Sequence, residues 1–226
     1  MAVGERSPGV GMVKQQRALR TRAVVLKAAA DAFDRGGYDG TSLSQVSKAA
    51  GMSVGALTFH FSTKADLADA VQEEGWMATQ AVLDRVTGRQ VPALRATIEI
   101  TLELARLMEE NVAVRSAVRL MRERPTASAW SDRWLPVVRE LLDEAHRSGQ
   151  ICEDALPADV ATLVEHLTSG AEVYTRERCG TGTGHQSAVG RLERVWHLAL
   201  KGVCAPDASL RTLVGAQRPA HTASSE

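Results

Sequence analysis

The stretch GMSVGALTFHF, residues 51–61, combines small residues with hydrogen-bonding and aromatic side chains. Gly55 and Ala56 are small enough to let another molecule approach the backbone closely. Thr58 and His60 carry a hydroxyl and an imidazole that can exchange hydrogen bonds with that molecule. Taken alone, His60 is more simply explained as an ordinary surface or core histidine, so its interpretation depends on the elements around it.

The spacing around this stretch predicts two short helices joined by a tight turn. Ser42 precedes a glutamine by three residues, as in a capping box, and begins a helix that ends at Ala50. Gly51 supplies the turn, and Ser53 can cap the next helix, Val54 to Phe61. We therefore expect a helix-turn-helix, whose second helix enters the DNA major groove and presents its amino-terminal residues to base edges.

Side-chain spacing also predicts which way this second helix faces. Leu57 and Phe61 are four positions apart and should point into a three-helix core, whereas Thr58 and His60 lie on other faces and can reach bases or phosphates. The first helix of that core is expected from Gln15 to Arg35, where two glycines end it.

The rest of the chain lacks alternating strand patterns, so we expect an all-α protein. A fourth helix begins near Asp66, and longer helices are predicted at 92–110, 111–124, 135–147, 158–178 and 187–203. The predicted organisation is a disordered N-terminus at 1–13, an N-terminal three-helix helix-turn-helix DNA-binding domain at 14–70, a larger C-terminal helical ligand-binding and dimerisation domain at 71–205, and a flexible tail at 206–226.

Charge is unevenly distributed along the chain. The 226 residues have a formal net charge of zero, yet residues 14–64 contain eight Lys and Arg against three Asp, a net charge of +5. This excess predicts a polyanionic partner. Lys14, Arg17, Arg20 and Arg22 could form an arm that reaches an adjacent groove or phosphates, and the alternative is a solvated basic end of the first helix.

Several function classes have no support in the sequence. Catalytic motifs are absent, and the Gly-rich stretch at 180–184 follows no strand and precedes no Lys-Ser/Thr pair, so we expect no enzyme and no cofactor. The three cysteines form no Cys-x-x-Cys pair, and we expect reduced thiols and no metal. With no apolar run long enough to span a membrane and no secretory signal, a cytoplasmic location is the default.

Residues from about Arg20 to Leu67 resemble the amino-terminal domain of the tetracycline-repressor (TetR) family of transcriptional regulators. The resemblance is carried by Ala-Ala…Phe, Gly-Tyr…Thr, Ala-Gly and His-Phe…Lys, in this order. It implies that Thr41 and Lys64 bind phosphates, that Gly55 lies against the DNA backbone, and that His60 closes the recognition helix.

Two positions depart from the family pattern. Val54 stands where many members have a basic residue, and Thr58 stands where many have a tyrosine that touches phosphate, so we expect fewer phosphate contacts here. The predicted DNA-binding residues are Arg20, Thr41, Ser42, Ser53, Val54, Gly55, Ala56, Thr58, His60 and Lys64.

The C-terminal part carries a second, weaker resemblance. The segment WLPVVRELLDEAHRSGQI, which begins at Trp134, is similar to the γ-butyrolactone receptor branch of the family, in which the matching tryptophan stacks on the signal molecule. From the residues alone, core packing is the simpler role for its apolar side chains. The predicted ligand-binding residues are Trp134, Trp130, Leu102, Met108, Val118 and Met121.

The last two long helices predict self-association. Both present apolar residues at helical spacing, and two such helices from each subunit would make a four-helix dimer interface. The leading hypothesis is a homodimeric repressor that binds a roughly palindromic double-stranded DNA operator and is released by a small-molecule effector, γ-butyrolactone-like or an antibiotic. The alternative is a DNA-binding regulator without an effector, whose large domain only dimerises or recruits another protein.

Overall fold

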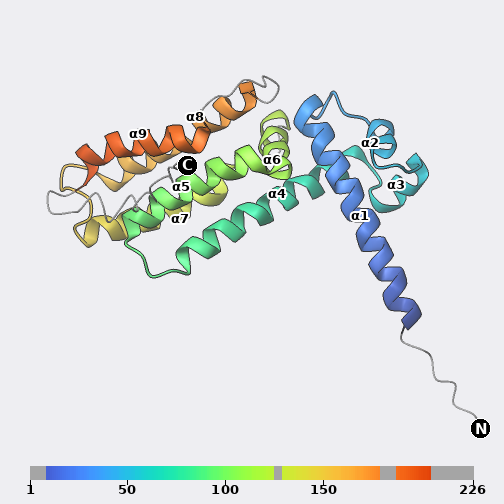
Figure 1. Cartoon of the computed structure of the whole chain (residues 1–226), viewed down its shortest axis with the longest axis horizontal. Coiled ribbons are helices and arrows are strands. Elements are labelled where there is room, and N and C mark those ends of the chain that lie inside the picture. Colours follow the sequence, from blue (N-terminus) through green and yellow to red (C-terminus); the bar gives the residue numbers. More distant parts are fainter. Residues whose placement is uncertain (1–8, 125–128, 179–186, 205–226) are drawn as a thin grey trace, which may run out of the picture. The chain divides into compact units, whose positions relative to one another are not determined.

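The computed structural model describes residues 9–124, 129–178 and 187–204, and every element that it defines there is a helix. The helices are α1 (Gly9–Gly36), α2 (Leu43–Ala49), α3 (Val54–His60), α4 (Lys64–Thr87), α5 (Ala93–Glu110), α6 (Val112–Glu123), α7 (Ser131–Arg147), α8 (Pro157–Arg178) and α9 (Ala188–Val203) (Figure 1). The predicted all-α class is confirmed. Cys179, the Gly-rich stretch at 180–184 and the predicted tail at 206–226 lie outside the described residues.

The chain divides into two compact units. The first contains residues 1–78 and 111–130, and the second contains residues 79–110 and 131–226. The first unit therefore extends beyond the predicted boundary at residue 70 and includes α6, which lies within the range predicted for the larger domain. Helix α1 begins at Gly9, inside the segment 1–13 for which we expected disorder.

The core of the first unit is built from α1, α2, α3, the start of α4 and α6. Its buried side chains are Val25, Leu26, Ala28, Ala29, Ala30, Phe33, Val46, Leu57, Phe61, Leu67, Ala68, Val71 and Leu120. Leu120 comes from α6, so this helix completes the core of the unit. Leu57 and Phe61 are both buried there, which confirms the predicted inward face of α3.

Helix α6 crosses α4 very closely at Gly75. A Cβ atom at this position would lie 2.5 Å from the Cβ of Ala117 and 2.8 Å from the carbonyl oxygen of Ala113. Both of these atoms belong to α6 and neither can rotate away, so only glycine fits at this crossing. The absence of a side chain at Gly75 thus fixes the approach of α6 to α4.

In the second unit, α5 packs against α7, α8 and α9, and α8 lies beside α9 (Figure 1). An isolated antiparallel bridge pairs Ile151, after α7, with Cys204, at the end of α9. Cys152 and Cys204 are free thiols. Helix α7 begins at Ser131, four residues before the predicted start, and holds Pro136 as its sixth residue, where the missing N–H removes one i→i−4 hydrogen bond. No helix in the described ranges is long and apolar enough to cross a membrane.

Candidate nucleic-acid interface

The predicted helix-turn-helix is present, with both expected caps. The hydroxyl of Ser42 accepts a hydrogen bond from the backbone N–H of Gln45, whose side chain accepts one from the N–H of Ser42, so the predicted capping box is confirmed. Gly51 ends α2 with a φ of +69°, and the N–H of Met52 donates to the carbonyl of Ser47. The turn is therefore tight, as the small residues predicted.

Helix α3 starts from a second cap. The hydroxyl of Ser53 accepts a hydrogen bond from the N–H of Ala56 at 3.2 Å. Val54, Gly55 and Ala56 are all exposed, and a Cβ atom at Gly55 would meet nothing within 4 Å. The amino-terminal end of α3 thus presents an open surface of small side chains, to which a large molecule could approach closely.

The most exposed side chain in the second half of α3 belongs to Phe59, which the prediction did not include. Thr58 is half-buried and its hydroxyl donates to the carbonyl of Gly55, while His60 is also half-buried. Phe59, which is not among the predicted DNA-binding residues, is 86% exposed, and its ring meets that of His60 edge to face with centroids 5.5 Å apart. The period of α3 could have identified Phe59, because it lies opposite Leu57 and Phe61.

Thr41, for which the family resemblance implies a phosphate contact, lies between α1 and α2. Its side chain is buried, and its hydroxyl is directed at the carbonyl oxygens of Gly37 (2.8 Å) and Ala32 (3.1 Å). In this arrangement Thr41 ties the end of α1 to the start of α2. To donate to a phosphate, the hydroxyl would have to turn its one hydrogen away from these carbonyls, and the phosphate contact of Thr41 stays a prediction.

Lys64, at the first position of α4, is held by Tyr38. The ammonium group donates to the carbonyl oxygen of Tyr38 at 3.0 Å and lies 4.3 Å from the centre of its ring. The Tyr38 ring also stacks on Phe33 and lies 5.3 Å from the guanidinium of Arg124. An ammonium has three donors, so Lys64 keeps donors for a phosphate while Tyr38 fixes its position.

A set of charged residues on α6 braces this region, and sequence reasoning missed it. Arg115 pairs with the carboxylate of Asp34 at 3.1 Å, and Arg119 donates to the carbonyl oxygen of the same residue at 2.7 Å. One turn later, Glu123 accepts a 2.6 Å hydrogen bond from the backbone N–H of Tyr38. Helix α6 therefore holds the end of α1 and the loop from which Tyr38 contacts Lys64.

Glu123 is stabilised as a carboxylate. Burial by itself raises the pKa of this group, but hydrogen bonds from Arg119 and from the Tyr38 backbone, with the charges of Arg119 and Arg122, lower the pKa below its ordinary value. Space for Glu123 comes from Gly37, where a Cβ atom would lie 2.5 Å from the carboxylate. The glycine that ends α1 thus also admits the brace.

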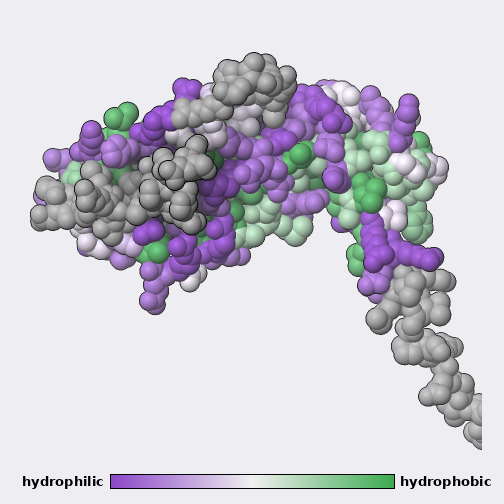
Figure 2. Space-filling view, viewed as in Figure 1, coloured by the Kyte–Doolittle hydropathy of each residue, from purple (hydrophilic) through white to green (hydrophobic). Residues whose placement is uncertain are grey.

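The basic segment at the start of α1 is helical and exposed to solvent. Arg17, Arg20 and Arg22 are exposed, and Figure 2 shows mainly hydrophilic residues on this part of α1. The guanidinium of Arg22 lies 5.2 Å from the centre of the Phe61 ring, at the carboxyl end of α3. A helical extension, rather than an extended arm, carries Arg17 and Arg20, and the side chain of Lys14 lies outside the described ones.

The six predicted ligand-binding residues fall in both units. Trp130, Val118 and Met121 belong to the first, and Trp134, Leu102 and Met108 belong to the second. Trp134 is 1% exposed, and Trp130, Met108 and Val118 are also buried. Their role in ligand binding stays a prediction.

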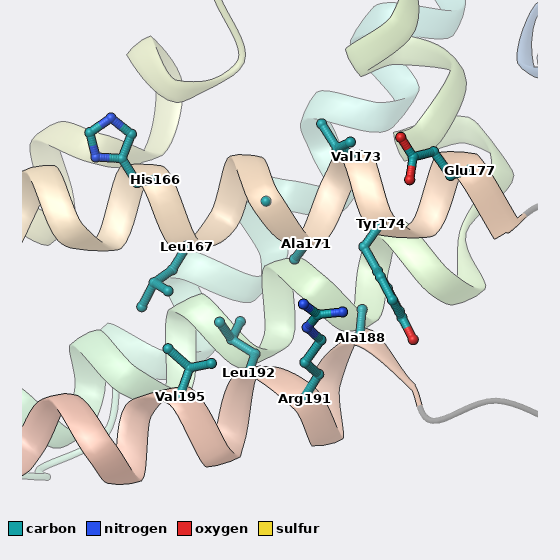
Figure 3. A pocket seen from close by; sticks show the side chains of 11 residues that line it. His166, Leu167, Ala171, Val173, Tyr174, Glu177, Ala188, Arg191, Leu192 and Val195 are labelled. Atoms are coloured by element: carbon teal, nitrogen blue, oxygen red, sulfur yellow. The ribbon is translucent and has the colours of Figure 1, made fainter.

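A pocket of about 400 Å³ lies between α8 and α9, and none of those six residues lines it. Leu167, Ala171 and Tyr174 point from α8 toward α9, and Leu192 and Arg191 point back (Figure 3). The guanidinium of Arg191 lies 4.9 Å from the centre of the Tyr174 ring. Among the residues that the structure describes, no three His, Cys, Asp or Glu side chains form a group that could hold a metal ion.

Known proteins resemble both the helix-turn-helix region and most of the chain. Residues 25–71 match the family described as bacterial regulatory proteins, tetR family. The A-factor receptor protein of Streptomyces griseus is 24% identical over 198 residues, which are 86% of this chain and 68% of that protein. The crystal structure of a γ-butyrolactone receptor (ArpA-like protein) is 29% identical, covers 87% of this chain and 94% of its own, and superposes with a TM-score of 0.73.

The TetR family protein CprB of Streptomyces coelicolor is also similar over most of its length. One structure is 31% identical, with a TM-score of 0.68, and covers 84% of this chain and 91% of that one. A second, described as in complex with its biological operator sequence, is 30% identical with a TM-score of 0.70 and covers 84% and 92%. This chain therefore belongs to the TetR family of bacterial regulatory proteins, near its γ-butyrolactone receptor branch.

Proposed function

We propose that this protein is a transcriptional repressor that binds a roughly palindromic DNA operator as a homodimer and is released by a small molecule. The observation that carries the proposal is the open amino-terminal end of α3, where Ser53 caps the helix and Gly55 leaves room for a close approach. A helix held in this way can enter the major groove with its first residues at the base edges. The relative CprB, whose structure is described with its operator, supports this interpretation.

The charged groups near α3 suit the phosphates on either side of the groove. Lys64 keeps donors while Tyr38 holds it, and Arg17, Arg20 and Arg22 are exposed on α1. Phosphate contacts fix the register of a protein on the duplex without reading sequence, whereas the face of α3 reads base edges. Two copies are needed because one short recognition helix discriminates weakly, and paired half-sites add affinity and specificity.

The effector is proposed to be γ-butyrolactone-like or an antibiotic, and the controlled genes to be those of antibiotic or other secondary metabolism. The support is the similarity to proteins described as γ-butyrolactone or A-factor receptors. Trp134 is the residue proposed to stack on the ligand. Release would follow if the ligand binds more tightly to a conformation of the dimer in which the two α3 helices no longer fit both half-sites.

One observation favours a second candidate, a DNA-binding regulator without an effector. Trp134 is almost completely buried, and none of the six predicted ligand contacts lines the pocket between α8 and α9. A large domain packed in this way could serve only for dimerisation or for recruiting another protein.

A DNA selection followed by a release assay separates these functions. The purified protein is mixed with a random duplex library, and the retained sequences should converge on an inverted repeat; no convergence would refute the regulator function.

On that operator, a γ-butyrolactone series should dissociate the wild-type complex. Trp134→Ala should bind the operator but resist release, whereas Trp134→Phe should keep part of the response. Retained operator binding shows that the variants fold, and a complex that no lactone or antibiotic dissociates would favour the second candidate.

A further inference from the structure

Phe59 is the most exposed of the large hydrophobic residues in the described parts of the chain. At 3.6 residues per turn it stands about 160° around α3 from both Leu57 and Phe61, which are buried, and about 40° from Gly55. It therefore lies on the outer face of the helix, beside the open glycine. Phe59 is 86% exposed, so the described residues of the first unit cover little of it.

The neighbours of Phe59 make it the most prominent group on this face. Gly55 and Ala56 carry little or no side chain, so the surface next to the ring is low. The edge-to-face contact with His60, at an interplanar angle of 86°, restrains the ring. A molecule that approaches the open end of α3 would thus meet this aromatic side chain.

The chemistry of a phenyl ring limits what it can read in a duplex. It has no N–H or O–H group for a phosphate or a polar base edge, and the apolar group that the major groove offers is the C5 methyl of thymine. We propose that Phe59 packs against a thymine methyl group in each half-site and sets a preference for thymine there. This inference rests on the proposed function, because it places α3 in the groove.

Another protein surface would also suit an exposed phenylalanine, and the charge of the surroundings favours DNA. The segment that carries α1, α2 and α3, residues 14–64, has a net charge of +5. A polyanion gains from this field, whereas an apolar protein surface does not. A contact with a second copy of the chain is kept as an outcome of the test.

The test removes the methyl group and the ring separately. On the operator selected by the wild-type protein, each thymine of a half-site is replaced in turn by deoxyuridine, which lacks only the methyl. At one position the wild type should lose about fourfold in affinity per half-site, the value expected for one buried methyl group. Phe59→Ala should bind the operator more weakly. Deoxyuridine at that position should no longer affect its affinity, whereas the effect of deoxyuridine at every other position should match the wild type. Phe59→Leu should keep part of the preference.

Met77→Ala is the matched control, because Met77 is also apolar and is 58% exposed on α4 of the same unit. It should leave affinity and the deoxyuridine profile unchanged, and thermal unfolding should show that every variant folds. The inference is overturned if Phe59→Ala keeps the wild-type profile, if it weakens all sequences equally, or if it changes only the oligomeric state. If the wild type selects no DNA, the proposed function itself fails, which is a distinct result.

Discussion

The ammonium group of Lys64 lies 3.0 Å from the carbonyl oxygen of Tyr38 and 4.3 Å from the centre of its ring. A flexible lysine side chain is thereby held at one place beside the helix-turn-helix. The backbone N–H of the same tyrosine donates to the carboxylate of Glu123, and its ring lies 5.3 Å from the guanidinium of Arg124. The position of the predicted phosphate contact is thus determined by a loop that α6 braces.

Lys64→Ala should weaken operator binding in a way that depends on salt. Affinity falls as salt rises, and if Lys64 neutralises one phosphate, its loss should make the slope of log affinity against log salt shallower by about one unit per subunit. Fluorescence anisotropy at four or five salt concentrations measures the slope. Arg147→Ala, an exposed change at the end of α7, should leave it unchanged. A Lys64→Ala slope equal to that of the wild type would remove Lys64 from the interface.

Glu123→Gln should change how stability depends on pH. The folded-state pKa of Glu123 is below its ordinary value of 4.5, so the carboxylate contributes stability above that value and loses it as the pH falls through the folded-state pKa. The glutamine side chain of the variant cannot be charged and contributes no such dependence. The difference in unfolding free energy between wild type and variant should therefore be constant above about pH 5.5 and shrink in more acidic solution.

Urea denaturation at half-unit pH steps measures this difference. The plateau at higher pH serves as the internal control, because there the carboxylate is fully ionised in both states. A difference that grows on acidification, or that stays flat to pH 3, would contradict the role of Arg119 and Tyr38 in stabilising the charge.

Gly75→Ala should destabilise the protein although alanine favours helices. The new methyl would lie 2.5 Å from the Cβ of Ala117, and overpacking of this kind costs about 1–3 kcal/mol. Gly202→Ala is the matched control in α9, because a Cβ there meets nothing within 4 Å. It should be neutral or stabilising by up to about 1 kcal/mol. Thermal unfolding compares the two, and equal effects would mean that α6 does not approach α4 as closely as described.

The sequence predicted the elements that depend on local patterns. Ser42, Ser53 and Gly51 specify caps and a turn within a few residues of themselves, so α2, α3 and their connection were predicted almost to the residue. The buried side of α3 followed from the spacing of Leu57 and Phe61. Only chemistry within one or two helical turns is needed for such predictions.

Contacts between distant segments were not predictable in this way. Asp34 and Arg115 are 81 residues apart in the chain, and no local pattern pairs them. The packing of α6 against α4 also depends on Gly75. The sequence does not show that Ala113 and Ala117 lie against this glycine. Thr41 illustrates the same limit, because its contacts with the carbonyl oxygens of Ala32 and Gly37 cannot be read from the sequence around it, while its phosphate contact stays a prediction.

Leu198→Glu should dissociate the proposed homodimer. Leu198 is 65% exposed on α9, so the change should cost the isolated subunit little, whereas a dimer built from α8 and α9 would have to bury the new carboxylate. Leu156→Glu is the control, because Leu156 is also apolar and 56% exposed but precedes α8. Sedimentation equilibrium should show a dimer for the wild type and for Leu156→Glu, and at least about tenfold weaker association for Leu198→Glu, the equivalent of about 1.4 kcal/mol. Unchanged association of Leu198→Glu would mean that this face of α9 lies outside the interface.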